Sequence, residues 1–165
     1  MSEIYLAGGC FWGLEEYFSR INGVTKTTVG YANGTTEATD YQQVHTTDHA
    51  ETVHVTYDEA VISLTDILRY YFRVIDPLSI NKQGNDVGRQ YRTGIYYSVD
   101  TDLPVINKAV AHQRQKLGTE LAVEIEPLRN YILAEDYHQD YLKKNPGGYC
   151  HIDVNKAYQP LTPEE

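Results

Sequence analysis

Cysteine is scarce in this sequence of 165 residues, which has only Cys10 and Cys150. Two thiols separated by most of the chain cannot build the disulfide framework of a small secreted domain, and no CxxC motif is present. In a reducing compartment such a pair is more often catalytic or free than structural. No basic segment followed by an apolar stretch opens the sequence, so we expect no secretory signal and a cytoplasmic location.

Long apolar runs and an excess of positive charge are also missing. No stretch approaches the ~20 apolar residues of a membrane-spanning helix. The 14 lysines and arginines are outnumbered by 23 aspartates and glutamates, which gives a net charge of −9. Because affinity for phosphate comes largely from basic side chains, we expect neither nucleic acid nor an anionic membrane as a partner.

The length corresponds to one domain, and the composition, 41% hydrophobic and 22% charged, is that of a folded protein. We therefore predict a single domain over residues 1–165. Near its end, Asn145-Pro146-Gly147-Gly148 is typical of a mobile, extended segment. We predict that residues 145–165 form a flexible, irregular tail that carries Cys150.

Apolar periodicity predicts alternating strands and helices. Strands are expected over residues 3–7, 24–31, 51–57, 90–99 and 121–125. Helices are expected over residues 13–21, 63–75, 101–117 and near 134–144. Most of the strands carry one apolar face, so the predicted fold class is α+β, with helices packed on a mainly antiparallel sheet.

Cys10 lies in a turn between the first strand and the first helix. A thiol at a helix N-terminus meets unpaired N–H groups, which lower its pKa and favour the reactive thiolate. The neighbouring glycines allow close approach of a ligand, and Phe11 and Trp12 provide an apolar wall. The alternative is that Cys10 is a small buried hydrophobic residue.

Glu51 begins a strand in which Val53, Val55 and Tyr57 share its face. If that apolar row is buried, desolvation raises the pKa of the Glu51 carboxyl and keeps a proton available near neutral pH. The alternative places Glu51 in water at the frayed start of the strand.

A cluster of histidines and acidic residues around Glu51 raises the question of a metal. The spacing argues against it, because His54 lies on the opposite strand face from Glu51 and no zinc-type pattern is present. We expect no metal site. The residues concerned are His45, Asp48, His49, Glu51 and His54.

Three further segments hold candidate functional groups. Residues 81–88 form a glycine-containing loop without a phosphate-binding pattern, in which Asp86 either acts on a ligand or bonds the loop backbone. Tyr91 shares a strand face with Thr93, Ile95 and Tyr97, so its hydroxyl points inward, either to a site or to the core. Cys150 is either a thiol brought to Cys10 by the tail or a bystander.

Short motifs that include these residues occur in a fixed order over nearly the whole chain. They run from Gly9-Cys10-Phe11-Trp12-Gly13 through Gly30-Tyr31, Tyr41, His49-Ala50-Glu51, Gln83-Gly84-Asn85-Asp86, Gln90-Tyr91-Arg92, Ala134-Glu135-Asp136 and His138-Gln139 to Asn145-Pro146 and Gly148-Tyr149-Cys150. In this order they resemble the A-type peptide-methionine sulfoxide reductases.

The resemblance implies a two-layer α/β sandwich (a ferredoxin-like plait) with a mainly antiparallel mixed sheet and an irregular C-terminal tail. It implies reduction of the S epimer of methionine sulfoxide, free or in proteins, to methionine. No cofactor is expected, thioredoxin is the expected reductant, and we expect a monomer.

The resemblance also assigns roles to residues. Cys10 attacks the sulfoxide sulfur and is left as a sulfenic acid, and Glu51 protonates the sulfoxide oxygen. Cys150 then forms a disulfide with Cys10. The remaining site residues are Tyr41 and Tyr91, which donate hydrogen bonds to the oxygen, Asp86, which orients substrate and water, and Phe11 and Trp12, which hold the S-methyl group.

Relatives that carry a further cysteine in the tail can shuttle a second disulfide, but residues 151–165 here contain none. A single relay through Cys150 is the hypothesis. Two other functions compete with it. A thiol peroxidase would need an arginine beside Cys10, and the nearest, Arg20, lies at the far end of the predicted helix. A non-catalytic module would bind oxidised methionine without turnover.

Overall fold

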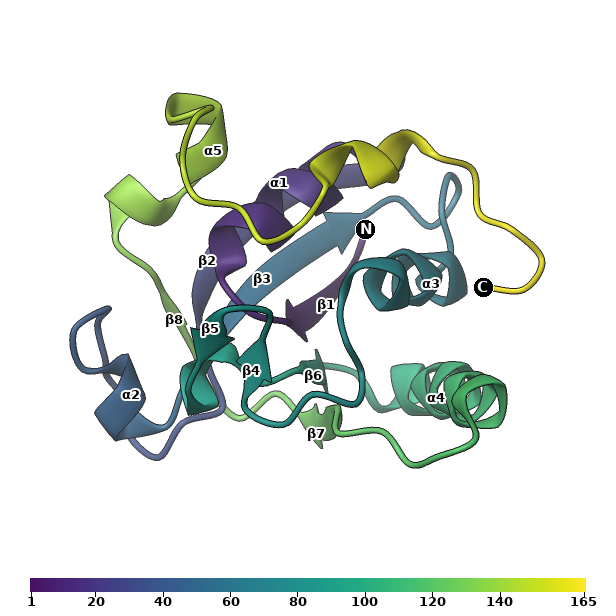
Figure 1. Ribbon diagram of the computed structural model, residues 1–165, viewed down its shortest axis with the longest axis horizontal. Helices are drawn as coiled ribbons and strands as arrows, with labels where there is room; N and C mark the ends of the chain where they lie inside the picture. Colours follow the sequence, from purple (N-terminus) through teal and green to yellow (C-terminus); the bar gives the residue numbers. More distant parts are fainter.

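A curled six-stranded mixed sheet organises the structure, a computed structural model that describes residues 1–165 (Figure 1). Its strand order is β7-β6-β1-β3-β2-β8, and four of the five pairings are antiparallel, whereas β6 and β7 are parallel. The strands are β1 Ser2–Ala7, β2 Val24–Ala32, β3 Ala50–Tyr57, β6 Gly94–Tyr97, β7 Glu124–Pro127 and β8 Tyr131–Leu133. A separate hairpin joins β4 Lys82–Gln83 to β5 Asp86–Val87.

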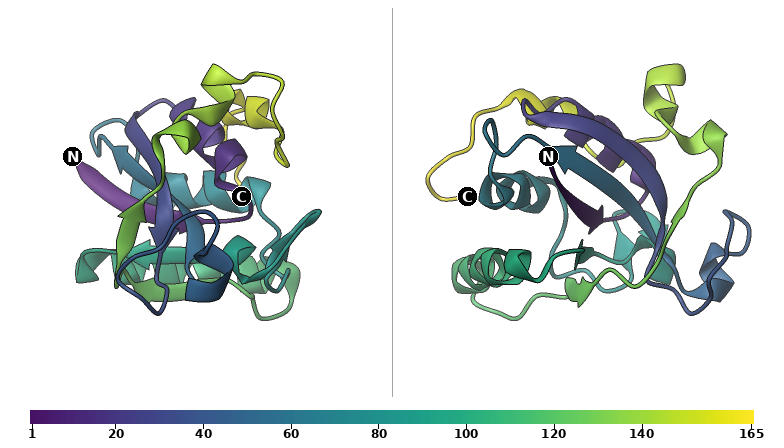
Figure 2. Two further views of the ribbon diagram at one scale, coloured as in Figure 1. Left: turned by 90° about the vertical axis from the view of Figure 1, so that its left-hand side faces the viewer. Right: turned by 180° about the vertical axis from the view of Figure 1, so that it is seen from behind.

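Five α-helices accompany the sheet. The three longer helices, α1, α3 and α4, lie next to the sheet in both views of Figure 2. They are α1 Phe11–Ser19, α2 Val44–Thr47, α3 Leu64–Val74, α4 Leu103–Leu117 and α5 Tyr141–Lys144. Ser63 caps α3 by accepting a hydrogen bond from the Asp66 N–H at 3.1 Å, which satisfies one of the free N–H groups of the first turn. No helix is long and apolar enough to cross a membrane.

The alternation of side chains along the strands decides where the core lies. Ile4 and Leu6 of β1 belong to the large apolar cluster that also contains residues of α1, α3 and α4. Tyr5 and Ala7, between them in sequence, belong to a small cluster of five buried residues on the other face. Because the helices add their apolar side chains to one face only, that face holds the main core and carries the N-terminus of α1.

The mixed α+β class is confirmed, but three predicted elements are wrong in detail. The strand expected over residues 121–125 begins only at Glu124 and runs to Pro127. The strand expected over residues 90–99 starts only at Gly94, because Arg89–Tyr91 form a 3-10 turn closed by the Tyr91 N–H on the Gly88 carbonyl at 3.0 Å. Tyr91 therefore does not lie on a strand face. The helix expected near 134–144 is interrupted, because Asp140 adopts φ of 51° ahead of α5.

The last residues run back over α1 and contact α3. Residues Val154–Tyr158 form a 3-10 helix within the segment predicted to be irregular. Arg73 of α3 donates hydrogen bonds to the carbonyls of Lys156, Gln159 and Pro160 at 2.7–3.0 Å and pairs with the Glu165 carboxylate at 2.6 Å. These contacts attach the second half of the tail to the body.

Candidate active site

Cys10 is the N-cap residue of α1 and is 8% exposed, as the predicted strand–turn–helix context requires. The turn depends on glycine at position 9, where φ is 81° and a Cβ would lie 2.7 Å from Nε2 of His151. No larger residue fits this conformation and this close approach. The thiol thus stands at the amino end of the helix, with the tail directly above the turn.

Burial raises the pKa of the Cys10 thiol, and the neighbouring Glu51 carboxyl raises it further. The Trp12 N–H at the helix N-terminus acts in the opposite direction but is outweighed. The prediction that this position lowers the pKa of Cys10 is therefore wrong. Cys10 is a protonated thiol at neutral pH.

Glu51 lies at the core face of β3 with 1% of its surface exposed, so the alternative at a frayed strand end is wrong. Its Oε1 accepts a hydrogen bond from the Phe11 N–H at 3.2 Å. Desolvation raises the pKa of Glu51 to about 8 despite that bond. At neutral pH the carboxyl beside Cys10 carries a proton that it can donate.

Two tyrosine hydroxyls complete the polar side of the site. Tyr41 comes from the loop that joins β2 to β3, and Tyr91 from the 3-10 turn ahead of β6. Burial raises the pKa of both hydroxyls, and Glu51 and Cys10 raise them further. Both groups therefore remain protonated hydrogen-bond donors in the neighbourhood of Glu51 and Cys10, with Tyr41 38% exposed at the surface.

Aromatic rings surround Trp12 and Phe11. Trp12 stacks on Tyr141 of α5 with 3.7 Å between ring centroids, and its Nε1–H points to Nδ1 of His138 at 2.9 Å. Phe11 is fully buried, and its ring centroid lies 5.1 Å from that of His138. The Tyr41 ring also contacts His138, with 4.5 Å between the centroids. Phe11 is therefore part of the core, whereas Trp12 is only partly buried.

His138 is a residue of this site to which the sequence assigned no role. Its side chain is completely buried, and its Nε2 has no hydrogen-bond partner. The signal available in the sequence was its place in the motif His138-Gln139. Only the folded chain shows that it joins Phe11, Trp12 and Tyr41.

Asp86 and Cys150 connect the site to the tail. The Asp86 carboxylate accepts a hydrogen bond from the Tyr149 hydroxyl at 2.8 Å. Next in sequence, the Cys150 thiol donates to the Ile152 carbonyl at 3.0 Å. A Cβ on Gly13, in the first turn of α1, would lie 2.8 Å from its Sγ. Both cysteines are free thiols, and Cys150 lies against the helix that Cys10 caps.

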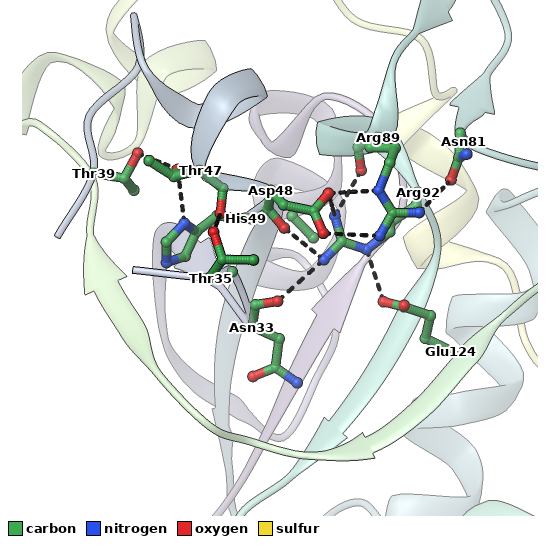
Figure 3. Close-up of polar contacts among 12 residues, drawn as sticks. Asn33, Thr35, Thr39, Thr47, Asp48, His49, Asn81, Arg89, Arg92 and Glu124 are labelled. Atoms are coloured by element: carbon green, nitrogen blue, oxygen red, sulfur yellow. Dashed lines mark hydrogen bonds and ion pairs between the residues drawn. The ribbon is translucent and has the colours of Figure 1, made fainter. Parts of the chain in front are cut away.

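The histidines and acids weighed as metal ligands point to different partners, and no group of three or more such side chains gathers. His54 stacks on Tyr5 and contacts the Glu3 carboxylate at 2.7 Å. Figure 3 shows His49 turned to Thr47, whereas Asp48 pairs with Arg89.

Figure 3 also shows how the loop that carries Tyr41 is fixed. The buried Arg92 guanidinium donates to the carbonyls of Asn33 and Asp48, at the two ends of the loop, at 3.3 and 2.9 Å. It also pairs with the Glu124 carboxylate at 2.8 Å. One side chain therefore holds both ends of the loop against β6 and β7.

Comparison with known proteins identifies the family to which this site belongs. Residues 2–165 match the family of peptide methionine sulfoxide reductases. The chain belongs to this family. It is 38% identical to Mxr1 of Saccharomyces cerevisiae in reduced form, with 93% of this chain and 90% of that chain covered and a TM-score of 0.85.

Other methionine sulfoxide reductases of known structure agree. Methionine sulfoxide reductase A of Corynebacterium diphtheriae is 36% identical over 90% of this chain and 76% of that chain, with a TM-score of 0.84. Mxr1 in complex with Trx2 is 29% identical over 85% of this chain and 84% of that chain, with a TM-score of 0.61. The protein is thus a methionine sulfoxide reductase.

Proposed function

We propose that this methionine sulfoxide reductase acts on the S epimer, in proteins or as the free amino acid, with Cys10 as its nucleophile. The observation that carries the proposal is the pairing of a helix-capping thiol with a buried, protonated carboxyl at Glu51. A sulfoxide oxygen is a poor leaving group until it is hydrogen-bonded and protonated, and a neutral carboxyl supplies both the hydrogen bond and the proton in the interior.

The first step transfers the sulfoxide oxygen to Cys10 and needs no cofactor. Sγ of Cys10 bonds to the sulfoxide sulfur while Glu51 gives its proton to the oxygen, and the thiol proton of Cys10 returns to Glu51. The oxygen then passes to Cys10, which becomes a sulfenic acid, and methionine leaves. The thiol is oxidised and the substrate sulfur is reduced by the same two electrons.

The other side chains hold the substrate in this geometry. Tyr41 and Tyr91 donate hydrogen bonds to the oxygen, which is supported by their protonated hydroxyls. The S-methyl group of the substrate packs against the rings of Trp12 and Phe11. Asp86 orients substrate and water. The hydrogen bond that its carboxylate accepts from the Tyr149 hydroxyl breaks when the tail moves.

Cys150 is the residue that closes the cycle. Its thiol attacks the sulfenic acid, which forms a Cys10–Cys150 disulfide and releases water. Thioredoxin then reduces that disulfide, a proposal supported by the structure of the yeast relative with the thioredoxin Trx2. A thiol peroxidase has no comparable support, because Arg20 pairs with Glu16 and Asn155 at the other end of α1.

We also propose that residues 1–165 form one domain of the ferredoxin-like kind, in two layers. The support is the succession β1-α1-β2-β3-α3-β6 together with the central strand order β6-β1-β3-β2. In this proposal only the first part of the tail, around Cys150, moves during catalysis.

The expected result for Cys150→Ser is one methionine per enzyme without reductant and no further turnover with thioredoxin. The first step uses only Cys10, so the first methionine forms at the wild-type rate, whereas the missing disulfide leaves thioredoxin nothing to reduce. The measurement is methionine released from each epimer of N-acetyl-methionine sulfoxide, with free thiols counted before and after.

Cys10→Ser is the control, and it should yield no methionine. Sustained thioredoxin-driven turnover by Cys150→Ser would remove Cys150 from the cycle. Absence of methionine from the S epimer in the folded, reduced wild type would contradict the assignment of the nucleophile and of the epimer.

A further inference from the structure

His151 lies directly over the turn that precedes Cys10, and the steps above leave it without a role. Its Nε2 is 3.1 Å from the Gly8 carbonyl oxygen. Because a carbonyl only accepts, Nε2 must carry the ring proton of the neutral imidazole. Nδ1 is then an unprotonated nitrogen with a free lone pair.

This Nδ1 is buried and has no hydrogen-bond partner. A Cβ on Gly13 would lie 3.6 Å from it and 2.8 Å from Sγ of Cys150. The basic nitrogen and the Cys150 sulfur therefore border the same small space beside the first turn of α1. A buried acceptor without a partner is costly, and a proton from a nearby thiol would satisfy it.

Charged and titratable groups face His151 from every element around it. Burial lowers the pKa of His151, and this effect exceeds that of Asp86, which raises it. The ring is therefore neutral at pH 7 and able to accept a proton. The surrounding groups are Asp86 of β5, Arg73 and Asp76 at the end of α3, Asp153 and Lys156 of the tail, and the two cysteines.

We propose that His151 is the base of the resolving step, with Nδ1 accepting the proton of the Cys150 thiol. The Cys150 thiolate then attacks the sulfenic sulfur of Cys10. The S–S bond forms as the S–O bond breaks, and His151 returns its proton to the leaving hydroxide as water. Cys150 is oxidised, the sulfur of Cys10 is reduced, and the imidazole is regenerated. The proposal rests on the proposed role of Cys150.

The test separates the two chemical steps in His151→Gln. A glutamine amide can still donate to the Gly8 carbonyl, but it has no basic nitrogen. Reduced enzyme is mixed with the S epimer, and methionine, free thiols and dimedone-trapped sulfenic acid are measured over time. Methionine should form within about twofold of the wild-type rate, while disulfide formation slows about 100-fold and sulfenic acid accumulates.

The pH dependence distinguishes a base from a structural support. In the wild type the rate of disulfide formation should fall as the pH drops through the lowered pKa of His151. In His151→Gln the rate should stay low through this acidic range and rise only at alkaline pH, where the Cys150 thiol, whose pKa burial raises, ionises without a base. A second variant, His151→Gly, should recover disulfide formation when imidazole is added.

Two results would overturn the proposal: wild-type rates of disulfide formation in His151→Gln, or a rate reduced by one constant factor at every pH. Thermal unfolding of each variant shows whether it folds. If His151→Gln does not fold, recovery of disulfide formation by imidazole in His151→Gly decides the test. Loss of methionine formation in the wild type would instead contradict the role of Cys10, and disulfide formation in Cys150→Ser would contradict that of Cys150.

Discussion

Glu51→Ala is expected to lower the rate of methionine formation by about 100-fold or more, whereas Glu51→Gln retains much of the activity. Removing one hydrogen-bond donor from an oxygen that gains negative charge costs about 10²–10³-fold in enzymes, and alanine removes this donor together with the proton. An amide cannot give up its proton, but it still donates a hydrogen bond in the same place. Single-turnover rates with the S epimer measure both effects.

The pH profile checks the same role independently. Because the pKa of Glu51 is raised to about 8, the proton-donating form predominates at neutral pH. The wild-type rate should fall as the pH rises through about 8, and this fall should be absent in Glu51→Gln. Equal losses of activity in Glu51→Ala and Glu51→Gln would contradict the view that Glu51 acts by donating a hydrogen bond.

Glu51 should also affect stability. The unfolded carboxyl has its ordinary pKa near 4.5, so the folded protein binds this proton more tightly than the unfolded chain. The contribution of this proton to the free energy of unfolding is therefore fully present below the unfolded pKa, and it is lost as the pH rises towards about 8. Glu51→Gln removes this loss, and at pH 7 the variant should be more stable by up to about 3 kcal/mol in denaturant unfolding.

Local patterns were sufficient to place Cys10 and Glu51. The Gly-Gly-Cys turn between a strand and a helix follows from residues adjacent in sequence, and period-two alternation puts Glu51 on the face of Val53 and Val55. The direction of the pKa shift of Cys10 was not predictable in this way. It depends on the depth of burial and on a carboxyl 41 residues away in sequence.

The parts that were missed depend on contacts between distant segments. Tyr91 leaves the strand for a turn next to Arg92, whose side chain reaches the loop between β2 and β3. His138 and His151 come from the last 30 residues, and only tertiary packing brings them to Phe11, Trp12 and the Cys10 turn. Periodicity contains no information about such contacts.

Arg92→Ala is expected to lower the free energy of unfolding by about 1.5–3 kcal/mol, the cost typical of losing hydrogen bonds between a buried charged group and its partners. Arg92 is 4% exposed and bonds Asn33, Asp48 and Glu124 (Figure 3). Its loss leaves the Asp48 carbonyl without a donor, whereas the Asn33 carbonyl keeps Arg129 and the Glu124 carboxylate keeps the Tyr96 hydroxyl. Urea unfolding of the variant and the wild type gives the difference.

Arg89→Ala is the matched control, because Arg89 pairs with the same Asp48 from the exposed side of the network. A solvent-exposed pair of this kind contributes about 0.2–1 kcal/mol, so burial and not charge alone should separate the two variants. Similar unfolding energies for Arg92→Ala and Arg89→Ala would show that the buried guanidinium does not support the fold.

The same substitution should affect the site, because Arg92 holds both ends of the loop that carries Tyr41. Arg92→Lys keeps the charge but cannot serve carbonyls and carboxylate at once. In this milder variant, amide hydrogen exchange should quicken in residues 33–49 while β1 and β3 stay protected, and the rate of methionine formation should fall with it. Faster exchange spread evenly over the sheet would mean that Arg92 stabilises the whole fold and not the Tyr41 loop in particular.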